Sequence, residues 1–235
     1  MLTKQEQEMY SRQTILKEIG PIGQELIQQA KITIIGVGAL GTGTAELLIR
    51  AGIKNLIIID NDTIELSNLQ RQNLFDQENL NKPKVTIAKN KLFKINPYAK
   101  IIAHNTTLNN ENIKELIPTN IDLILDSTDN METRFLLDNY CKNNNIKWVF
   151  ASAAGTKGML AAIFPEGPRL ADFLPNNAQG ETSCSMGVLN TVTRIISAMQ
   201  TTLALKIITN NQVNYNELTT YDAWNNEINK LKIKN

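Results

Sequence analysis

The chain has 235 residues, of which 42% are hydrophobic and 20% charged, and its formal net charge at pH 7 is +1. This composition is typical of a globular α/β domain and excludes wholesale disorder. A charge so close to neutral gives no electrostatic footprint for nucleic acid or an anionic membrane, and no apolar run is long enough to span a bilayer. We therefore expect no nucleic-acid or membrane partner.

The amino terminus and the cysteines predict where the protein works. Residues 1–8 are polar and lack the apolar core of a signal peptide. Cys141 and Cys184 are the two cysteines of the sequence, and one pair cannot form a disulfide framework. We expect a cytoplasmic protein.

Strand and helix patterns alternate up to residue 151. Short apolar runs typical of buried parallel strands predict strands at 31–35, 56–60, 100–103, 121–125 and 147–151. Helices are predicted at 5–19, then after a break at 20–23 up to residue 31, and at 42–50, 83–94 and 131–143. This alternation predicts an α/β fold, Rossmann-like, with a mostly parallel sheet and helices on both faces.

The pattern changes after Gly155. Residues 159–164 predict a strand, and prolines and glycines then mark a long irregular segment, 165–186. A long apolar helix is predicted at 188–208, and the tail at 213–233 predicts two short strands that form a C-terminal antiparallel extension. We interpret 1–235 as one domain, made of N-terminal helices (1–30), a Rossmann-like core (31–152), and a crossover loop, long helix and C-terminal strands (153–235).

A glycine loop follows the first predicted strand. Gly36 permits a tight turn, Gly38 lets the backbone approach a phosphate, and Gly41 permits close packing of a helix on the strand. Asp60, at the end of the next strand, is placed to accept hydrogen bonds from a ribose. On these residues alone, a nicotinamide dinucleotide site is an equal alternative.

The residues after Asp60 favour phosphate chemistry. Asn68, Arg71 and Gln72 follow within a dozen residues, and Lys84 comes shortly after them. A dehydrogenase needs only the acidic residue at the end of the strand. Two cations and two amides close to a glycine loop indicate a site for the phosphates of a nucleotide rather than one for hydride transfer.

Five segments together resemble the ThiF/MoeB/HesA family, the bacterial relatives of ubiquitin-activating enzymes. The resemblance is carried by Ser11-Arg12-Gln13, Gly36 to Gly41, Asp60 to Gln72, Lys82-Pro-Lys84 and Ser127-Thr-Asp-Asn130. It covers nearly the whole chain, and its string Ser-Asn-Leu-Gln-Arg-Gln is highly specific.

The resemblance implies a reaction and roles for single residues. Enzymes of that family bind Mg-ATP and adenylate the C-terminal glycine carboxylate of a small β-grasp sulfur carrier protein ending in Gly-Gly. Matching positions imply that Asp60 holds the ribose and that Asp129 binds Mg²⁺. They also imply that Arg12 reaches the phosphates from the partner subunit of a homodimer. The ATP site implied is Gly36, Gly38, Ala39, Gly41, Asp60, Asp62, Ser67, Asn68, Leu69, Gln70, Arg71, Gln72, Lys84, Asp129 and Asn130, and the catalytic candidates are Arg12, Arg71, Lys84 and Cys184.

The cysteines and the histidine give four further expectations. In relatives, a cysteine in the crossover loop can form a covalent link to the carrier during sulfur transfer, and Cys184 matches it; the alternative is an ordinary loop residue. Cys141 is expected to be a small buried hydrophobe, and His104 a surface or edge residue. Many relatives bind zinc through two Cys-x-x-Cys pairs, which this chain lacks, so we expect no zinc.

Adenylation suits a chain with one histidine and no candidate triad. A terminal carboxylate has a pKa of about 3.3–3.7 and is already ionised at neutral pH, so the nucleophile needs no general base. We predict an adenylyltransferase for a ThiS- or MoaD-like carrier, with thiamine biosynthesis first because of Cys184. The alternatives are adenylation of the molybdopterin-synthase carrier or of a ribosomal peptide, a nicotinamide-dependent oxidoreductase, and a non-catalytic carrier-binding module.

Overall fold

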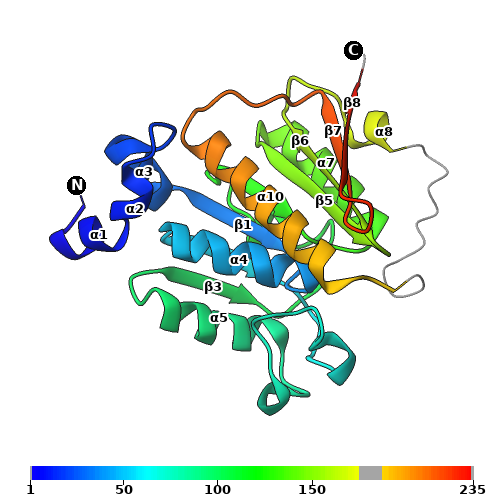
Figure 1. Ribbon diagram of the computed structural model, residues 1–235. Helices are drawn as coiled ribbons and strands as arrows, with labels where there is room; N and C mark the ends of the chain where they lie inside the picture. The colour runs from blue at the N-terminus through cyan, green and yellow to red at the C-terminus, as the bar shows by residue number, and fades with distance from the viewer. Residues whose placement is uncertain (1, 175–186, 234–235) are drawn as a thin grey trace.

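The structure is a computed structural model that describes residues 2–174 and 187–233 (Figure 1). Over these residues the strands form one eight-stranded sheet in the order β3-β2-β1-β4-β5-β6-β7-β8. The strands are β1 (Lys31–Ile35), β2 (Asn55–Ile59), β3 (Lys100–His104), β4 (Leu123–Asp126), β5 (Trp148–Ala154), β6 (Lys157–Ile163), β7 (Glu217–Asp222) and β8 (Glu227–Lys232).

The sheet has a parallel half and an antiparallel half. Strands β3, β2, β1, β4 and β5 pair in parallel, with Ile34 opposite Ile58 on one side and Leu125 on the other. Strands β5 to β8 pair antiparallel. The predicted Rossmann-like sheet with a C-terminal antiparallel extension is confirmed.

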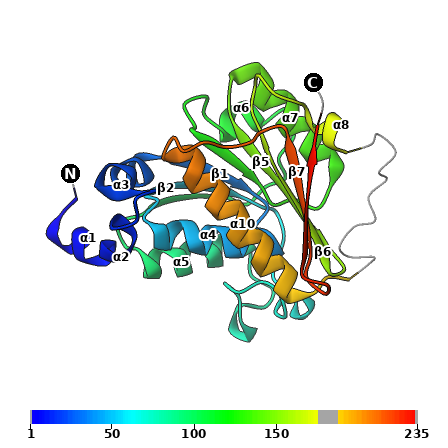
Figure 2. The same cartoon turned by 45° about the horizontal axis from the view of Figure 1, so that its top comes forward.

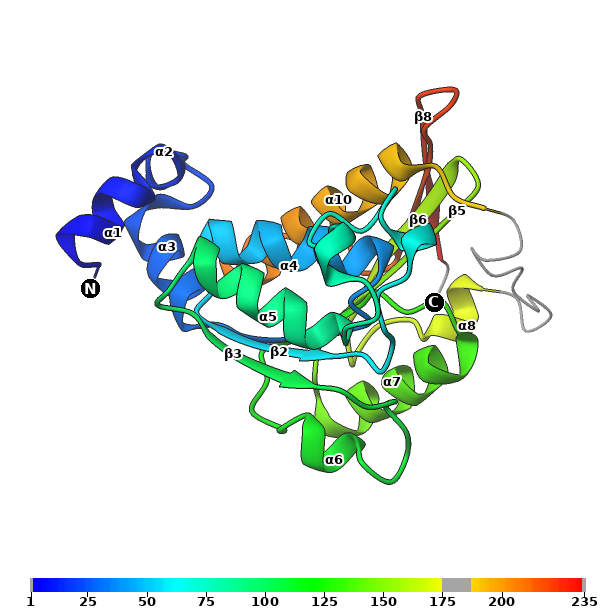
Figure 3. The same cartoon turned by 90° about the horizontal axis from the view of Figure 1, so that it is seen from below.

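Helices cover both faces of the sheet, as predicted (Figures 1 and 3). One apolar core lies under α3, α4, α5 and α10, and a second lies under α6, α7 and α8. The helices are α1 (Lys4–Met9), α2 (Ser11–Thr14), α3 (Gly20–Gln29), α4 (Ala39–Ala51), α5 (Lys84–Ile95), α6 (Ile113–Leu116), α7 (Met131–Asn144), α8 (Leu170–Phe173) and α10 (Asn190–Ile208), with 3-10 turns η1 (Leu66–Asn68) and η2 (Gln77–Asn79).

The N-terminal helices differ from the prediction. The expected helix at 5–19 is two short helices, because α1 ends at its C-cap residue Tyr10. The expected break at 20–23 is instead the start of α3, where Pro21 lies in the first turn, a position that needs no backbone N–H. Pro83, which was expected in the first turn of α5, is instead its N-cap residue. The short helices α6 and α8 were not predicted.

Helix α10 packs across α4 and the middle of the sheet (Figure 2). The fully buried Gln200 of α10 donates to the carbonyl oxygens of Asp126 (2.7 Å) and Val149 (3.3 Å). Its own oxygen accepts hydrogen bonds from the hydroxyls of Thr44 (2.8 Å) and Ser127 (3.4 Å). One amide therefore joins α10, α4, β4 and β5 beneath the residues that follow β4.

Three of the sequence-based expectations concern a membrane span, Cys141 and His104. Within the described ranges, no helix has the length and apolar character needed to cross a membrane. Cys141 of α7 is buried, as predicted, and burial raises the pKa of its thiol. His104, at the end of the edge strand β3, is partly exposed, which agrees with the expectation of an edge residue.

Candidate nucleotide-binding site

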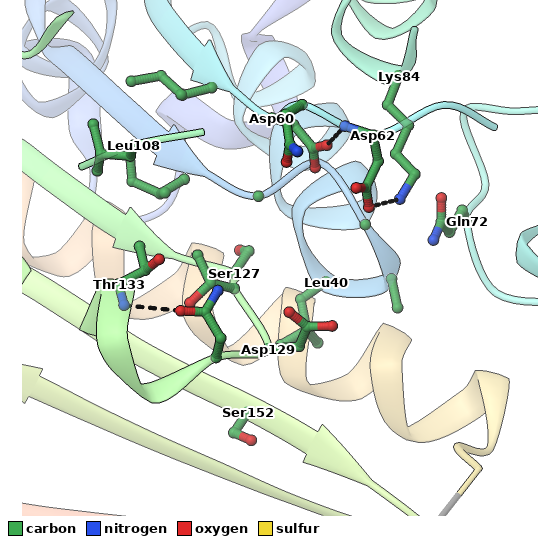
Figure 4. Close-up of a pocket in the computed structure, with 18 of the residues that line it drawn as sticks. Leu40, Asp60, Asp62, Gln72, Lys84, Leu108, Ser127, Asp129, Thr133 and Ser152 are labelled. Carbon is green, nitrogen blue, oxygen red and sulfur yellow. Dashed lines mark hydrogen bonds and ion pairs between the residues drawn. The ribbon is translucent and has the colours of Figure 1, made fainter. Parts of the chain in front are cut away.

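A cleft of about 730 Å³ opens at the carboxyl ends of the parallel strands (Figure 4). Its floor includes Ile35 at the end of β1, Ile59 at the end of β2, Ser127 just after β4, and Ser152 in β5. Strand β1 lies between β2 and β4, so the chain crosses over in opposite directions on its two sides. Open α/β sheets bind ligands at this kind of switch point.

The glycine loop between β1 and α4 has three different requirements. Gly36 has φ +86°, and a Cβ there would lie 2.6 Å from the carbonyl oxygen of Ser127. A Cβ at Gly41 would lie 2.0 Å from the carbonyl oxygen of Gly36. A Cβ at Gly38 would meet only Nε2 of Gln72, at 3.8 Å. The protein's own packing therefore requires Gly36 and Gly41, whereas Gly38 leaves open space in the cleft beside the start of α4.

Asp60 ties the glycine loop to the turn that follows β2. Its carboxylate accepts hydrogen bonds from the backbone N–H groups of Val37 (2.6 Å) and Asp62 (2.8 Å). Burial raises the pKa of Asp60, and the charge of Lys84 together with these hydrogen bonds opposes the rise. Each carboxylate oxygen still has a lone pair, so a ligand hydroxyl at the cleft can donate to it.

Lys84, the first residue of α5, brings a buried ammonium group to the cleft wall. Its side chain is only 7% exposed, and Nζ lies 2.7 Å from Oδ2 of Asp62 (Figure 4). The backbone N–H of Lys84 also donates to the carbonyl of Asp62, at 2.9 Å. A buried cation needs such a partner. The segment after Asp60 therefore fixes both the position and the charge balance of the lysine.

The segment 65–72 supplies further amide and guanidinium groups to the cleft, and Gln72 lies on the same side of it as Lys84 (Figure 4). Nη1 of Arg71 donates to the carbonyl oxygen of Ser67 at 2.8 Å, and Oδ1 of Asn68 accepts from the backbone of Glu65 at 3.2 Å. Gln72 is 3% exposed, and its Oε1 has no hydrogen-bond partner among the described residues. An unpaired buried acceptor beside a cleft fits a ligand or water that donates to it.

The residues after β4 present an acidic group. Asp129 is exposed at the cleft, and no described residue pairs with its carboxylate. Oδ1 of Asn130 accepts from the N–H of Thr133 at 2.8 Å and so caps α7. Mg²⁺ is held in proteins by one or two carboxylates together with substrate phosphates, so Asp129 fits a metal that arrives with the nucleotide. In the parts of the chain described, no group of three or more acidic, His or Cys side chains could hold a metal ion by itself.

A buried ion pair beneath Asp129 was not predicted. Nε of Arg134 lies 3.2 Å from Oδ2 of Asp126, and Nη2 donates to the carbonyl of Thr128 at 2.6 Å. Burial raises the pKa of Asp126, and the Arg134 guanidinium opposes that rise. The sequence did carry a signal, because an acid that ends a fully buried strand needs a buried partner.

The structure brings together most of the predicted ATP site. The predicted residues that line the cleft are Gly36, Gly38, Ala39, Asp60, Asp62, Asn68, Arg71, Gln72, Lys84, Asp129 and Asn130.

Five other predicted residues that the structure describes do not line the cleft. Gly41 and Leu69 do not line the cleft, while Ser67 supplies the carbonyl that holds Arg71, and Nε2 of Gln70 donates to the carbonyl of Val188 at 3.4 Å. Arg12 is exposed on α2, away from the cleft of its own chain. Cys184 is outside the described residues.

Fold and cleft together define a Rossmann-like protein with a nucleotide-type site that carries cations at its walls. The sequence model of the ThiF family matches residues 10–235, and the chain belongs to this family, as its motifs predicted.

Relatives in this family are named adenylyltransferases. The molybdopterin-synthase adenylyltransferase of Haemophilus influenzae is 37% identical over 88% of this chain and 86% of its own length. The sulfur carrier protein ThiS adenylyltransferase of Escherichia coli is 32% identical over 96% of this chain and 90% of its own. The chain is an enzyme of this class, which confirms the prediction.

A solved structure shows the same fold. Escherichia coli MccB with ATP superposes with a TM-score of 0.83 over 96% of this chain and 71% of MccB, at 21% identity. At so low an identity the likeness concerns the fold alone.

Proposed function

We propose that this protein uses Mg-ATP to adenylate the C-terminal glycine carboxylate of a small β-grasp sulfur carrier protein that ends in Gly-Gly. The observation that carries the proposal is the pair of cations, Arg71 and Lys84, on the walls of a cleft that also holds an unpaired acid, Asp129. The two cations can bind the negatively charged phosphates of ATP, and the carboxylate of Asp129 can bind the Mg²⁺ that accompanies them. Relatives named for adenylation of ThiS or of molybdopterin synthase support the same reaction.

The chemistry follows from the charges in the cleft. A carboxylate oxygen of the carrier attacks the α-phosphorus of ATP, the bond from that phosphorus to the pyrophosphate oxygen breaks, and pyrophosphate leaves. The nucleophile is already an anion at neutral pH, so no residue has to remove a proton. Arg71 and Lys84 reduce the repulsion between the two anions, and the N-terminus of α4 adds a partial positive charge. Mg²⁺ held at Asp129 would neutralise further phosphate charge.

We propose that Arg12 acts at the cleft of a second subunit. It is exposed on α2 and does not line its own cleft. Ile15, three residues further on, is 73% exposed, and Leu16 beside it is also exposed. Apolar exposure next to an unused arginine supports a homodimer in which Arg12 of one subunit reaches the cleft of the other.

The test presents purified protein with Mg-ATP, labelled pyrophosphate, and either a thiamine-type or a molybdopterin-type carrier. We expect carrier-dependent exchange of pyrophosphate into ATP, and none with a carrier that lacks its terminal glycine. The choice of the thiamine carrier rests on Cys184 alone, so faster exchange with the molybdopterin carrier would overturn that choice. Absence of exchange with both carriers would contradict adenylation of a sulfur carrier.

A further inference from the structure

Arg194 of α10 is a half-buried cation that belongs to none of the sequence motifs and does not line the cleft. It forms no ion pair within 4.0 Å among the described residues. Burial lowers the pKa of its guanidinium, and the charge of Glu46 opposes this effect. Its hydrogen bond runs instead from Nη2 to the backbone carbonyl oxygen of Arg71, at 3.4 Å. Removing a cation from water without an ion-pair partner is costly, so its position requires a reason.

Helix α4 has a glycine, Gly43, at the place where this guanidinium lies. A Cβ at Gly43 would be 2.8 Å from Nη1 of Arg194 and 2.8 Å from Oγ of Ser197. Oγ of Ser197, one turn further along α10, lies 2.9 Å from the carbonyl oxygen of Leu40 in the first turn of α4 and 2.7 Å from that of Thr193 in its own helix. The same face of α10 therefore fastens to the start of α4 and carries Arg194 towards Arg71.

Arg194 holds one end of a short segment, Arg71–Asn73, which we name the clamp segment. At its other end, Nδ2 of Asn73 donates to the carboxylate of Glu46 on α4. Gln72 lies between these two attachments and lines the cleft together with Arg71. The clamp segment is thus anchored on α10 at one end and on α4 at the other.

We propose that Arg194 is a positioning residue for adenylation, which fixes the Arg71 guanidinium and the Gln72 amide by holding the carbonyl of Arg71. The inference rests on the proposed function, since it assigns Arg194 to that reaction. A donor that must be in place before charge develops is worth most when its own backbone is fixed. The planar guanidinium can lie against Gly43 and donate to Arg71 at once, which an ammonium cannot do.

Kinetics of carrier-dependent pyrophosphate exchange test the proposal with Arg194→Met, which keeps an apolar stem but has no donor. We expect kcat to fall by about 10-fold, the typical loss of one hydrogen bond from a charged donor, with the KM for carrier unchanged. Arg194→Lys, which keeps the charge and can donate to the Arg71 carbonyl but lacks the planar group that lies against Gly43, should recover part of kcat. Lys206→Met removes an exposed cation near the far end of α10 and should behave as wild type.

Exchange of backbone amide hydrogens gives a second readout that needs no activity. The amides of Arg71 and Gln72 both donate to the carbonyl of Asn68 at 3.0 Å. In Arg194→Met their exchange should become about 10-fold faster, while the amides of α10 keep their protection. If hydrogen exchange at these two amides in Arg194→Met is as slow as in wild type, or if kcat is unchanged, the proposed role of Arg194 is wrong. A wild-type enzyme without pyrophosphate exchange would instead overturn the proposed function.

Discussion

Lys84 and Asp62 form an ion pair of 2.7 Å between a nearly buried ammonium and a carboxylate that is 59% exposed. This difference in exposure lets the two side chains respond differently to a ligand. We propose that Asp62 balances the charge of the lysine when no ligand is bound, and that its exposed carboxylate returns to water when a phosphate oxygen takes its place. The lysine has no such freedom, because its side chain is enclosed at the start of α5.

Removing the Lys84 ammonium should therefore disable the reaction without unfolding the protein. We expect Lys84→Met to lower the rate of adenylation by about 10²- to 10³-fold, the usual loss of one preorganised charge donor. Lys82→Met is the matched control, since Lys82 donates to the carbonyl of Glu78 at 2.9 Å and does not line the cleft. Initial rates of pyrophosphate exchange measure both. Equal rates for the two variants would remove Lys84 from the site.

Asp129 should control the requirement for magnesium. Asp129→Asn removes a charge that no described residue pairs with, so the loss falls on the metal and not on the fold. We expect the Mg²⁺ concentration for half-maximal rate to rise by about 10-fold or more, where each factor of ten corresponds to about 1.4 kcal/mol. Glu132→Gln, an exposed acid in the first turn of α7, serves as control. An unshifted Mg²⁺ dependence would argue that the metal is held elsewhere.

The parallel half of the fold was readable from the sequence because its information is local. The strand at residues 31–35 is an isoleucine-rich run followed at once by a glycine loop, and only a buried parallel strand satisfies both features. The break predicted at Gly20-Pro21 was wrong for a physical reason. Glycine and proline also start helices, and which role they take depends on what the following turn packs against.

The positions of the candidate site residues were predicted correctly where they follow from a motif of their own. Asp60 and Lys84 lie where their spacing placed them, at the ends of secondary-structure elements that meet at the cleft. The ion pair of Asp126 with Arg134, and the contact of Arg194 with the backbone of Arg71, were not predicted. The Asp126 pair joins β4 to the helix that directly follows it, and its signal was the acid at the end of a buried strand. The Arg194 contact joins residues 123 positions apart and depends on how α10 packs against the segment after η1, which a single sequence does not state.

Substitutions of Gly38 and Gly41 should affect different properties, ATP affinity at Gly38 and the free energy of unfolding at Gly41. A methyl group at Gly41 would lie 2.0 Å from a backbone oxygen, so Gly41→Ala should lower the free energy of unfolding by about 3 kcal/mol or more. A methyl group at Gly38 meets no described atom closer than 3.8 Å and projects beside the cleft. Gly38→Ala should therefore unfold like wild type but bind ATP about 10-fold more weakly or worse.

Urea unfolding and calorimetric titration with Mg-ATP measure the two effects separately. Wild-type affinity in Gly38→Ala would mean that no phosphate approaches this part of the loop. A stable Gly41→Ala protein would mean that α4 can move away from β1 without cost.

Glu6 in α1 predicts an acid-sensitive contribution to stability far from the cleft. Its side chain is buried, forms an ion pair with Lys54, and accepts hydrogen bonds from the N–H of Thr3 (2.9 Å) and from Gln28 (3.0 Å). The Lys54 contact is the largest cause that lowers the pKa of Glu6 from 4.5 to about 2. A carboxyl group with a lowered pKa stabilises the folded state above its unfolded pKa and loses that effect as the pH falls towards the folded value.

The contribution of Glu6 should therefore be complete at neutral pH and decline from about pH 4.5 downwards, with a full size of at most about 3 kcal/mol. Glu6→Gln keeps the shape of the side chain and removes the titration. Between about pH 7 and about pH 3.5, wild type should lose about 1 kcal/mol more of its free energy of unfolding than Glu6→Gln does. Urea unfolding at the two pH values gives this difference directly. Equal losses would show that Lys54 does not hold the carboxylate in its charged form, because only a shifted pKa makes the two proteins respond differently to acid.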